Sequence, residues 1–564
     1  MKISRLKLLS SPSELAQLLN IPQKFFLYHL YGQQPTNQYM QWSIPKKNGG
    51  KRNITSPNPE LKMIQSRLAN YLQECLQEIR SNQNFHINLS HGFEVDKSIL
   101  TNAEIHIGQK YILNIDLENF FHSINFGRIR GFFIKNVHFQ LHPTIATCIA
   151  HIACYNNYLP QGSPCSPVIS NLICSVLDIR LKNLAKKYKC FYTRYADDLT
   201  FSTYLKYFPE QIAKSNYYLN VELSALLIKE IQKAGFNINP TKTRLQHTNI
   251  RQEVTGLTVN KKLSVHTDYR NLCRAKAHHL FSHGYYFTFD KQTLSQRSGS
   301  LKELEGQLAF INSLDKYNRE INKAKTEKTN KRENLYGKFI FYKNFLCNEK
   351  TILLTEGKTD IQHIKCALIG LKLNTLSNSL QFYKHSPSKT FLMTYICQQK
   401  LNFCAGSPGL KAFIKAYNRL YKSILKGKHK PSNPVIIIVD NDHEGEDIKK
   451  IIMKEFNIPI NTNQPTRIIY NLFIIFLSPP SFMSSHTNTA PHRNIEIEDL
   501  YPQYILDTQL NGKKFNRTNH ESTDTEYGKD SFVSKVIKSK IDKPIFDGFK
   551  KLFNDIELIQ KSYK

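Results

Sequence analysis

Hydrophobic residues in the first 314 positions recur with helical spacing in some segments and form strand-like runs in others. Three segments keep the helical period: 62–80, 167–185 and 219–234, the last ending at Gly235. Two segments are strand-like: the run YILNI at 111–115, and FYTRYADDLTFST at 191–203, which predicts two strands around a tight turn. This mixture predicts an α+β domain over residues 1–314.

The pattern changes after that domain. Between Lys316 and Lys338 the chain is rich in Lys, Asn, Glu and Thr, which predicts an exposed, partly helical, basic connector over 315–348. From Thr351 onwards, the runs TILLTE and PVIIIVDND have strand length and alternate with helical patterns. This alternation predicts an α/β domain with a parallel sheet over 349–564, ending in a polar, basic tail of about sixty residues.

Composition adds a partner class to this picture. The 564 residues exceed the roughly 250–300 over which one core usually grows, so two or more domains are expected. Lys and Arg total 77 against 45 Asp and Glu, a net charge of +32. A field of this size attracts polyanions, most commonly nucleic acid. A soluble basic protein without such a partner, or one that binds anionic lipid, is the alternative.

The cysteines and the N-terminus indicate the compartment. Eleven cysteines are scattered singly with no C-x-x-C pair, which argues against a zinc site and favours reduced thiols. The first nineteen residues contain no long apolar run and predict an amphipathic helix capped near Ser11 or Ser13. The longest apolar run, Leu472 to Leu477, is too short to span a bilayer. We therefore expect a cytoplasmic protein without a membrane partner.

Three short segments carry candidate polymerase chemistry. NIDLENFFHSI places Asp116 at a strand end, LPQGSPCSPVISNL places Gln161 and Gly162 before a helix, and RYADD places Asp197 and Asp198 in a hairpin turn. Nucleotide addition is an in-line displacement in which two Mg²⁺ ions, roughly 3.5–4 Å apart, activate the hydroxyl and stabilise pyrophosphate. Carboxylates suit Mg²⁺. An isolated Asp pair is ordinary turn chemistry, but all three segments in order favour a catalytic set.

Together these segments resemble the palm motifs of reverse transcriptases. The resemblance implies an α+β right-hand polymerase with fingers, palm and thumb. It implies that Asp116, Asp197 and Asp198 are catalytic and hold two Mg²⁺ ions. It also implies that Gln161 and Gly162 lie in the loop that contacts the template and the incoming deoxynucleoside triphosphate (dNTP).

The same resemblance suggests further nucleotide contacts. Phe121 matches an aromatic steric gate whose ring crowds a 2′-OH and favours dNTPs. Core packing is the alternative for this ring, and is what we expect of Phe120. Upstream, IPKKNGGKRNI resembles the fingers hairpin, in which Lys47 or Lys51, with Arg52, clamps the triphosphate. An exposed basic hairpin without a function is the alternative.

Two shorter motifs resemble one branch of this family, the retron reverse transcriptases. Asn102 and His106 belong to an NAxxH motif, and Val254, Thr255 and Gly256 form a VTG triplet. The resemblance implies that these residues take part in RNA binding. Taken from the residues alone, NAxxH is also compatible with a simple helix turn, and VTG with a strand that ends in glycine.

Membership of that branch implies a specific reaction. Retron enzymes recognise a structured noncoding RNA encoded beside their gene and start DNA synthesis from a 2′-OH of an internal guanosine. They stop partway, leaving a branched RNA–DNA molecule called msDNA. The basic segment containing Arg270 and Arg274 fits a thumb that grips an RNA stem through its phosphates. A solvated helix face is the alternative.

The second half carries a different acidic pattern. TEGKTD places Glu356 after the first strand, and DNDHEGE places Asp440, Asp442 and Glu444 after a later one. The pattern resembles the TOPRIM domain of topoisomerases, primases and OLD-type nucleases. It implies that Glu356 is a general acid/base and that these four residues hold one or two Mg²⁺ ions. Acidic turns at strand ends, without a catalytic role, are the alternative for these residues. The later run IEIEDLY, at 495–501, either completes this site or begins a solvated helix.

We therefore expect a retron RNA-directed DNA polymerase with a C-terminal TOPRIM nuclease effector. Its partners would be the cognate structured RNA, dNTPs, the msDNA product and a nucleic-acid substrate of the TOPRIM domain, and a homo-oligomer is compatible with the sequence. The effector would act in antiphage defence. The alternative is an RNA-binding, polymerase-like scaffold whose TOPRIM module is inert or dimerising.

Overall fold

The structure is a computed structural model that divides into two compact units. It describes residues 2–45, 50–82, 89–215, 221–290, 295–321, 330–383, 407–425, 430–483, 494–517 and 524–563. The first unit comprises residues 1–270 with 291–295 and 314–322; the second comprises 271–290, 296–313 and 323–564.

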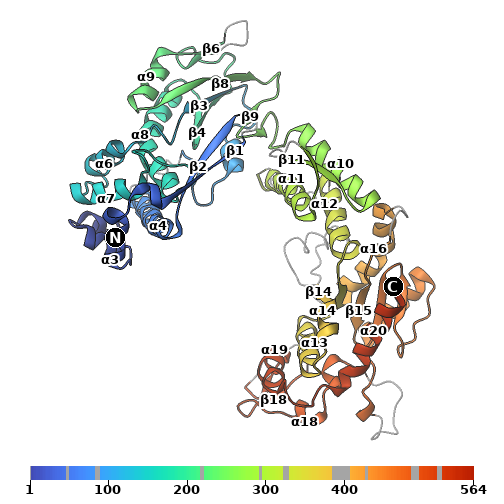
Figure 1. The fold of residues 1–564 in the computed structure, drawn as a ribbon. Coiled ribbons are helices and arrows are strands. Elements are labelled where there is room, and N and C mark those ends of the chain that lie inside the picture. The colour runs from blue at the N-terminus through green and yellow to red at the C-terminus, as the bar shows by residue number, and fades with distance from the viewer. Residues whose placement is uncertain are drawn as a thin grey trace. The chain divides into compact units, whose positions relative to one another are not determined.

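A four-stranded antiparallel sheet organises the first unit (Figure 1). Its strand order is β4 (Phe191–Tyr195), β5 (Asp198–Thr203), β3 (Tyr111–Glu118) and β8 (Asn237–His247). The strands predicted at 111–115 and 191–203 are therefore confirmed. Because β3 lies between β5 and β8, Asp116 near its end pairs with Asp198 on one side and with Asn239 on the other.

Helices pack on this sheet and share one hydrophobic core with it. They are α4 (Pro59–Asn82), α6 (Phe126–Lys135), α7 (Pro143–Ala153), α8 (Cys165–Lys187) and α9 (Ala225–Lys233). Helices α4 and α8 confirm the periods read at 62–80 and 167–185. Helix α8 is apolar around most of its circumference, which is typical of a helix enclosed in a core.

The helix expected at 219–234 is only partly correct. Strand β7 (Val221–Leu223) pairs with β6 (Ala213–Ser215), and the helix begins after it. Ser224 sets that beginning, because its side chain accepts a hydrogen bond from the Leu227 amide at 3.1 Å. Gly235 follows the helix with φ +75°, in agreement with its predicted place at the helix end.

The N-terminal segment forms short helices and a hairpin. They are α1 (Lys2–Lys7), α2 (Pro12–Leu18), α3 (Gln23–Leu27), the π-helix η1 (Tyr28–Gly32), the 3₁₀ helix η2 (Pro35–Gln38), β1 (Tyr39–Pro45) and β2 (Lys51–Pro57). Ser11 caps α2 in a capping box with Glu14, so the expected cap is confirmed, although two helices replace the single one predicted.

A five-stranded sheet organises the second unit. Its order is β14 (Leu380–Phe382), β13 (Thr351–Thr355), β15 (Val435–Val439), β17 (Leu472–Phe476) and β16 (Thr466–Ile469). All neighbours are parallel except β16, which pairs antiparallel with β17. The expectation of a parallel α/β sheet is confirmed.

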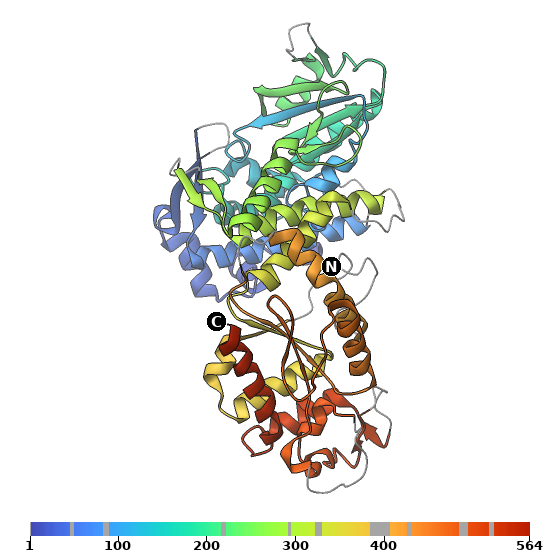
Figure 2. The same cartoon turned by 90° about the vertical axis from the view of Figure 1, so that its right-hand side faces the viewer.

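Helices cover both faces of this sheet, as its three central strands, which are buried along their whole length, require. Helices α13 (Lys358–Gly370) and α20 (Lys550–Tyr563) share a core cluster with the strand residues of one face. Helix α17 (His443–Phe456), which packs with α16 (Ser407–Leu425), lies on the other side (Figure 2).

The basic connector expected at 315–348 differs from the structure. Helix α11 (Leu301–Ile321) runs through residue 314, and α12 (Lys331–Phe341) continues into the π-helix η3 (Tyr342–Leu346). Phe339 and Phe341 are fully buried. The prediction relied on the abundance of Lys and Asn and overlooked the helical spacing of the aromatic residues. It therefore placed an exposed segment where α12 is packed. The compact units accordingly do not divide at 314.

The expected basic C-terminal tail is also wrong. Its apolar residues join the core of the second unit, including Leu552, Phe553, Ile556 and Ile559 on α20. Their spacing forms one apolar helix face, whereas the average composition is polar because the opposite face is charged.

Two expectations concern the chain as a whole. Among the helices that the structure describes, none combines the length and the apolar character that crossing a membrane requires. The nine described cysteines are free thiols, while Cys397 and Cys404 lie outside the described residues.

If α20 is part of the core, Ile556→Ala loosens the second unit. Ile556 is completely buried, and truncating such a side chain costs about 2–5 kcal/mol. We expect faster hydrogen exchange in peptides from β15 and β17. Leu558→Ala is the matched control, because Leu558 is 56% exposed on the same helix. Wild-type exchange rates in the Ile556 variant would show that the helix is dispensable.

Candidate functional sites

Antiparallel pairing brings the three palm aspartates to one place. Asp116 near the end of β3 is directly opposite Asp198, the first residue of β5. Asp197 precedes Asp198 in the β4–β5 turn, and its carbonyl accepts a hydrogen bond from the Leu117 amide at 3.0 Å. The turn is tight enough to place Ala196 at φ +56°. The structure thus brings together the residues expected to be catalytic.

Burial and mutual repulsion alter the acidity of this group. The pKa of Asp198 is raised to about 7, first by burial and then by the charges of Asp197 and Asp116. Burial also raises the pKa of Asp197. Lys242 offsets this repulsion, because its Nζ lies 2.9 and 2.8 Å from the two carboxylate oxygens of Asp116. The site therefore concentrates negative charge and already attracts a cation.

The donor set fits Mg²⁺ chemically, since it consists of adjacent carboxylates whose mutual repulsion Lys242 offsets only in part. Within the described part of the chain, no three Asp, Glu, His or Cys side chains converge closely enough to form a ready metal site. At Asp116, the Lys242 ammonium group holds the carboxylate instead. Asn239 on the neighbouring strand adds a hydrogen bond to Asp116 at 3.2 Å.

A buried ion pair between Arg194 and Asp178 supports the β4–β5 turn. Arg194 is fully buried, and its Nε and Nη2 each lie 2.8 Å from an oxygen of Asp178 on α8. Its Nη1 donates to Ala196 O and to Asn171 Oδ1, both at 3.2 Å. Asp178 also accepts from the Tyr192 hydroxyl at 2.9 Å. Arg194 thus ties the turn that carries Asp197 to the core helix.

The loop containing Gln161 is attached to the fingers hairpin. The Gln161 carbonyl accepts a hydrogen bond from the Thr55 amide on β2 at 2.8 Å. Gly162 has φ +131°, and a Cβ there would meet Thr55 O at 2.7 Å, so only glycine fits this approach. Both residues therefore lie where β2 meets the palm.

The hairpin also brings a cation near the aspartates. Arg52 on β2 is exposed, and its charge acts to lower the pKa of Asp197. Lys51 is exposed at the start of β2. Lys47 lies outside the described residues.

The two adjacent phenylalanines differ as expected. Phe120 is buried and stacks on Phe236 with ring centroids 5.6 Å apart, which confirms a core role. Phe121 is only partly buried and faces the exposed ring of Phe93 at 6.2 Å. Its position beyond Asp116 leaves the steric-gate role as a proposal.

The NAxxH and VTG motifs pack against one another. Helix α5 (Ile99–Glu104) contacts the hairpin of β9 (Glu253–Val254) and β10 (Leu257–Thr258). Thr255 and Gly256 form its two-residue turn with φ +46° and +82°, as a type I′ turn requires.

Burial contradicts direct RNA binding by part of this set. Asn102, His106 and Val254 are completely buried, so their side chains are not available to RNA. His106 joins two palm strands instead, with Nδ1 2.6 Å from Ser202 Oγ and Nε2 2.8 Å from Thr193 Oγ1. Burial lowers the pKa of His106 to about 3, which keeps the ring neutral.

Basic residues of the expected thumb are accessible. Helix α10 (Thr267–His283) presents Arg274 as an exposed side chain and Arg270 as a half-buried one. The following strand β11 (Phe287–Asp290) exposes the rings of Phe287 and Phe289. Cations next to exposed aromatic rings are suited to phosphates and unpaired bases.

In the second unit, Glu356 follows β13 and Asp440 follows the adjacent parallel strand β15. Burial raises the pKa of Glu356 to about 7, and the charges of Asp442 and Glu444 add to this shift. The pKa of Asp440 is also well above its usual value, mainly because of burial. Asp442 caps α17 by accepting from the Gly445 amide at 2.9 Å. The structure thus assembles the four acidic residues at one sheet edge.

The later acidic run reaches the same edge. Ile495 pairs with Asn441 through two backbone hydrogen bonds of 2.8 and 3.1 Å, which brings Glu496 and Glu498 beside Asp440. Lys529 lies 2.9 Å from Glu496 and 3.3 Å from Glu498. This run therefore belongs to the acidic cluster, and does not form a solvated helix start.

Sequence reasoning missed several residues of these sites. They are Lys242 and Asn239 beside Asp116, Arg194 and Asp178 beneath the turn, and Asp360, His363 and Lys529 in the acidic cluster. Asp360 and Arg194 lay within quoted motifs, TEGKTD and RYADD, although no role was assigned to either. The others are joined to their sites by long-range pairing.

Comparisons with known proteins give the class of the chain. Residues 44–267 match the family model described as reverse transcriptase (RNA-dependent DNA polymerase). The retron Mx162 reverse transcriptase of Myxococcus xanthus is 34% identical over 333 residues, which are 54% of this chain and 64% of the relative. The retron Ec86 reverse transcriptase of Escherichia coli is 34% identical over 281 residues, 49% of this chain and 77% of the relative.

The chain belongs to the retron reverse transcriptases. A further relative, the retron Mx65 enzyme of Myxococcus xanthus, is 32% identical over 55% of its own length, so the match spans less than two thirds of both Myxococcus enzymes. A solved structure of telomerase from Candida albicans with a TWJ fragment of telomeric RNA aligns with 74% of this chain and 64% of its own, at a TM-score of 0.33 and 12% identity. That likeness is too weak to establish a shared fold.

If the Arg194–Asp178 pair supports the turn, Asp178→Asn destabilises the first unit. A buried guanidinium deprived of its carboxylate costs about 3–5 kcal/mol. Urea unfolding followed by circular dichroism measures the loss. Adding Arg194→Met should recover part of it, whereas independent effects would simply add. Glu230→Gln is the control, because it disrupts only a surface pair with Lys233 and should cost under about 1 kcal/mol.

Proposed function

We propose that this chain is an RNA-directed DNA polymerase that copies a cognate structured noncoding RNA into msDNA. The observation that carries the proposal is the pairing of Asp116 with Asp198 beside Asp197, in a chain that belongs to the retron reverse transcriptases. The substrates are dNTPs, and the primer is a 2′-OH of an internal guanosine in that RNA.

The proposed polymerase mechanism assigns a task to each neighbouring group. The three aspartates would hold two Mg²⁺ ions, which when bound would supply Lewis-acid activation of the hydroxyl and stabilisation of the pyrophosphate. Lys242 holds Asp116 in place and limits its repulsion from the pair. Arg52 offers a guanidinium fork to the triphosphate. Phe121 crowds the 2′ position of the incoming sugar, and the loop of Gln161 and Gly162 borders the template.

The proposed RNA grip combines charge with shape. The net charge of +32 and the exposed Arg274 favour phosphate contacts, which give affinity that falls steeply as salt rises. The buried Asn102 and His106 contribute by fixing the palm and the VTG hairpin, and not by touching RNA.

We further propose that the second unit is a TOPRIM nuclease effector in antiphage defence. Glu356 and Asp440 follow neighbouring parallel strands, the edge at which α/β domains build their sites. The acidic donors fit Mg²⁺, with Glu356 as general acid/base. In this scheme, msDNA restrains the effector until infection disturbs the complex.

Asp197→Ala is expected to abolish msDNA in cells that express the cognate RNA, because the turn loses a carboxylate that no neighbour replaces. RNA binding should stay within about twofold of wild type, since phosphate contacts dominate affinity. Gel analysis of msDNA and filter binding of the RNA provide the two readouts.

Asp547→Ala is the matched control, because Asp547 is an exposed carboxylate in the second unit. Wild-type msDNA in the Asp197 variant would refute the assignment of the polymerase site. Loss of RNA binding together with msDNA would indicate a folding defect in that variant.

Glu356→Ala is expected to spare msDNA and to remove protection from phage, because the two acidic sites belong to different units. Plating efficiency and msDNA are measured on the same cultures. The control is Glu455→Ala, an exposed residue on α17. Full protection by the Glu356 variant would mean that the acidic cluster is structural and the second unit an inert or dimerising module.

A further inference from the structure

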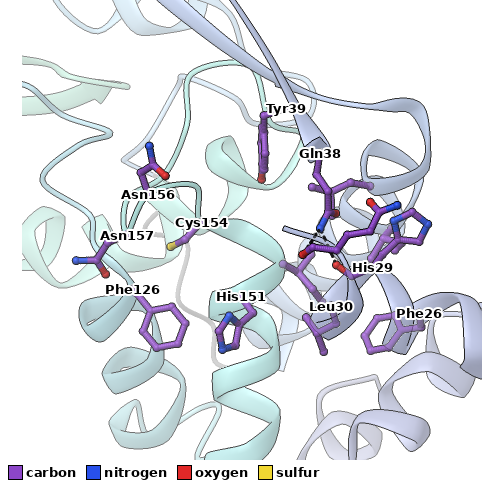
Figure 3. Close-up of a pocket in the computed structure, with 14 residues that line it drawn as sticks. Phe26, His29, Leu30, Gln38, Tyr39, Phe126, His151, Cys154, Asn156 and Asn157 are labelled. Carbon is purple, nitrogen blue, oxygen red and sulfur yellow. Dashed lines mark hydrogen bonds between the residues drawn. The ribbon is translucent and has the colours of Figure 1, made fainter. Parts of the chain in front are cut away.

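A cavity of about 390 Å³ lies in the first unit, between the N-terminal helices and the α6–α7 region (Figure 3). This volume is within the roughly 300–1,000 Å³ typical of small-molecule sites. Its inner wall includes Phe26, His29 and Tyr39, all buried. His151 and Asn157 are exposed lining residues, and they mark its mouth.

The cavity contains buried polar atoms that lack a partner. Among the residues that the structure describes, His29 Nδ1, Gln33 Oε1 and Gln38 Oε1 have none. His29 is 6% and Gln38 4% exposed, so both side chains lie almost wholly beneath the protein surface. Leaving such an atom unpaired costs about 1–3 kcal/mol. Three in one cavity point to an occupant.

The orientation of the Gln38 amide defines what that occupant must offer. Gln38 Nε2 donates to His29 O at 3.0 Å and to Gln33 O at 3.4 Å, so its oxygen is the group left towards the cavity. An amide oxygen only accepts. The occupant therefore brings N–H or O–H donors to this wall.

The remaining lining restricts the occupant to a flat, neutral group. Among the described residues that line the cavity there is no Lys, Arg, Asp or Glu, so a phosphate or a metal ion would find no counter-charge from them. Aromatic and imidazole rings supply stacking surfaces, among them Phe126 and His151, which are in edge contact at 4.9 Å. Side-chain amides supply both donors and acceptors. These are the elements with which proteins hold an unstacked base.

We propose that this cavity binds a nucleobase with an exocyclic amine, presented by a single-stranded part of the RNA partner. Adenine, cytosine and guanine carry an amine with two N–H donors, which matches the two unpaired oxygens of Gln33 and Gln38, whereas the Watson–Crick edge of uracil has a single N–H donor. The choice of RNA as the source rests on the proposed function, and a free nucleotide is the other source of the same chemistry.

The cavity wall is also joined to the nucleotide loop. Gln65, fully buried, donates to the Tyr39 hydroxyl and to Ile152 O, both at 2.8 Å, and accepts from Ser163 Oγ at 2.8 Å. Ser163 directly follows Gly162. A base that contacts Tyr39 therefore adds to the same hydrogen-bonded chain that holds this loop.

The test compares labelled, unstructured RNA oligonucleotides, oligoadenylate against oligouridylate, binding to the full-length protein by fluorescence anisotropy at raised salt. Gln38→Leu and His151→Ala should weaken oligoadenylate binding roughly fivefold to tenfold and leave oligouridylate binding unchanged. Gln34→Leu is the matched control, because Gln34 is exposed and lies outside the cavity lining. Unchanged oligoadenylate affinity in both variants overturns the proposal.

A second measurement needs no variant of the cavity. Oligoadenylate carrying 8-azidoadenosine is photocrosslinked to wild-type protein, and the adduct should map to peptides containing Tyr39 or His151. Adducts confined to other peptides overturn the proposal. Competition by adenosine monophosphate as strong as that by the oligonucleotide overturns RNA as the source.

Primer extension on a generic template separates this proposal from the polymerase assignment. The cavity variants should extend normally, because the palm aspartates are intact. Absence of extension by the wild-type protein would count against the polymerase and not against the cavity. Loss of extension in His151→Ala, whose side chain is exposed, would show that the cavity serves catalysis and would overturn a purely RNA-binding role.

Discussion

In the first unit, backbone pairing between strands holds three mutually repelling carboxylates together, and the rest of the site is arranged around them. Strands β3 and β5 set Asp116 against Asp198, next to Asp197, although burial and like charge disfavour three carboxylates at one point. Lys242 at Asp116 offsets part of this cost, while Arg194 fixes the turn through its hydrogen bond to Ala196 O. The repulsion that remains between the three carboxylates favours the binding of cations at this site.

The second unit solves a similar problem with parallel strands. Adjacent parallel strands end at the same edge of the sheet. Glu356 and Asp440 therefore lie close together although 83 residues separate them in the sequence. A third segment completes the cluster by pairing with Asn441, and Lys529 compensates part of the charge. In both units, an electrostatically unfavourable group is paired with a lysine or arginine that the chain supplies from a distant position.

Much of this was predictable, because strand runs and turns are local. The spacing around Asp116 and the RYADD turn predicted the palm site, and the two strand runs predicted the acidic edge. Lys242, Arg194 and Lys529 were not predictable, because their partners are set by sheet register and helix packing. Composition misled at α12 and α20, where charged outer faces conceal apolar inner ones. Motif resemblance misled at Asn102 and His106, because both side chains are completely buried.

The most direct test of the central claim uses purified full-length protein, the structured RNA transcribed beside its gene, and labelled dNTPs. The account predicts a labelled DNA whose 5′ end is joined to a 2′-OH of the RNA, so that a debranching enzyme releases it. Asp198→Asn protein should yield none, because the carboxylate opposite Asp116 is lost. Only linear DNA from the cognate RNA, or labelled branched DNA from the Asp198 variant, would contradict the account.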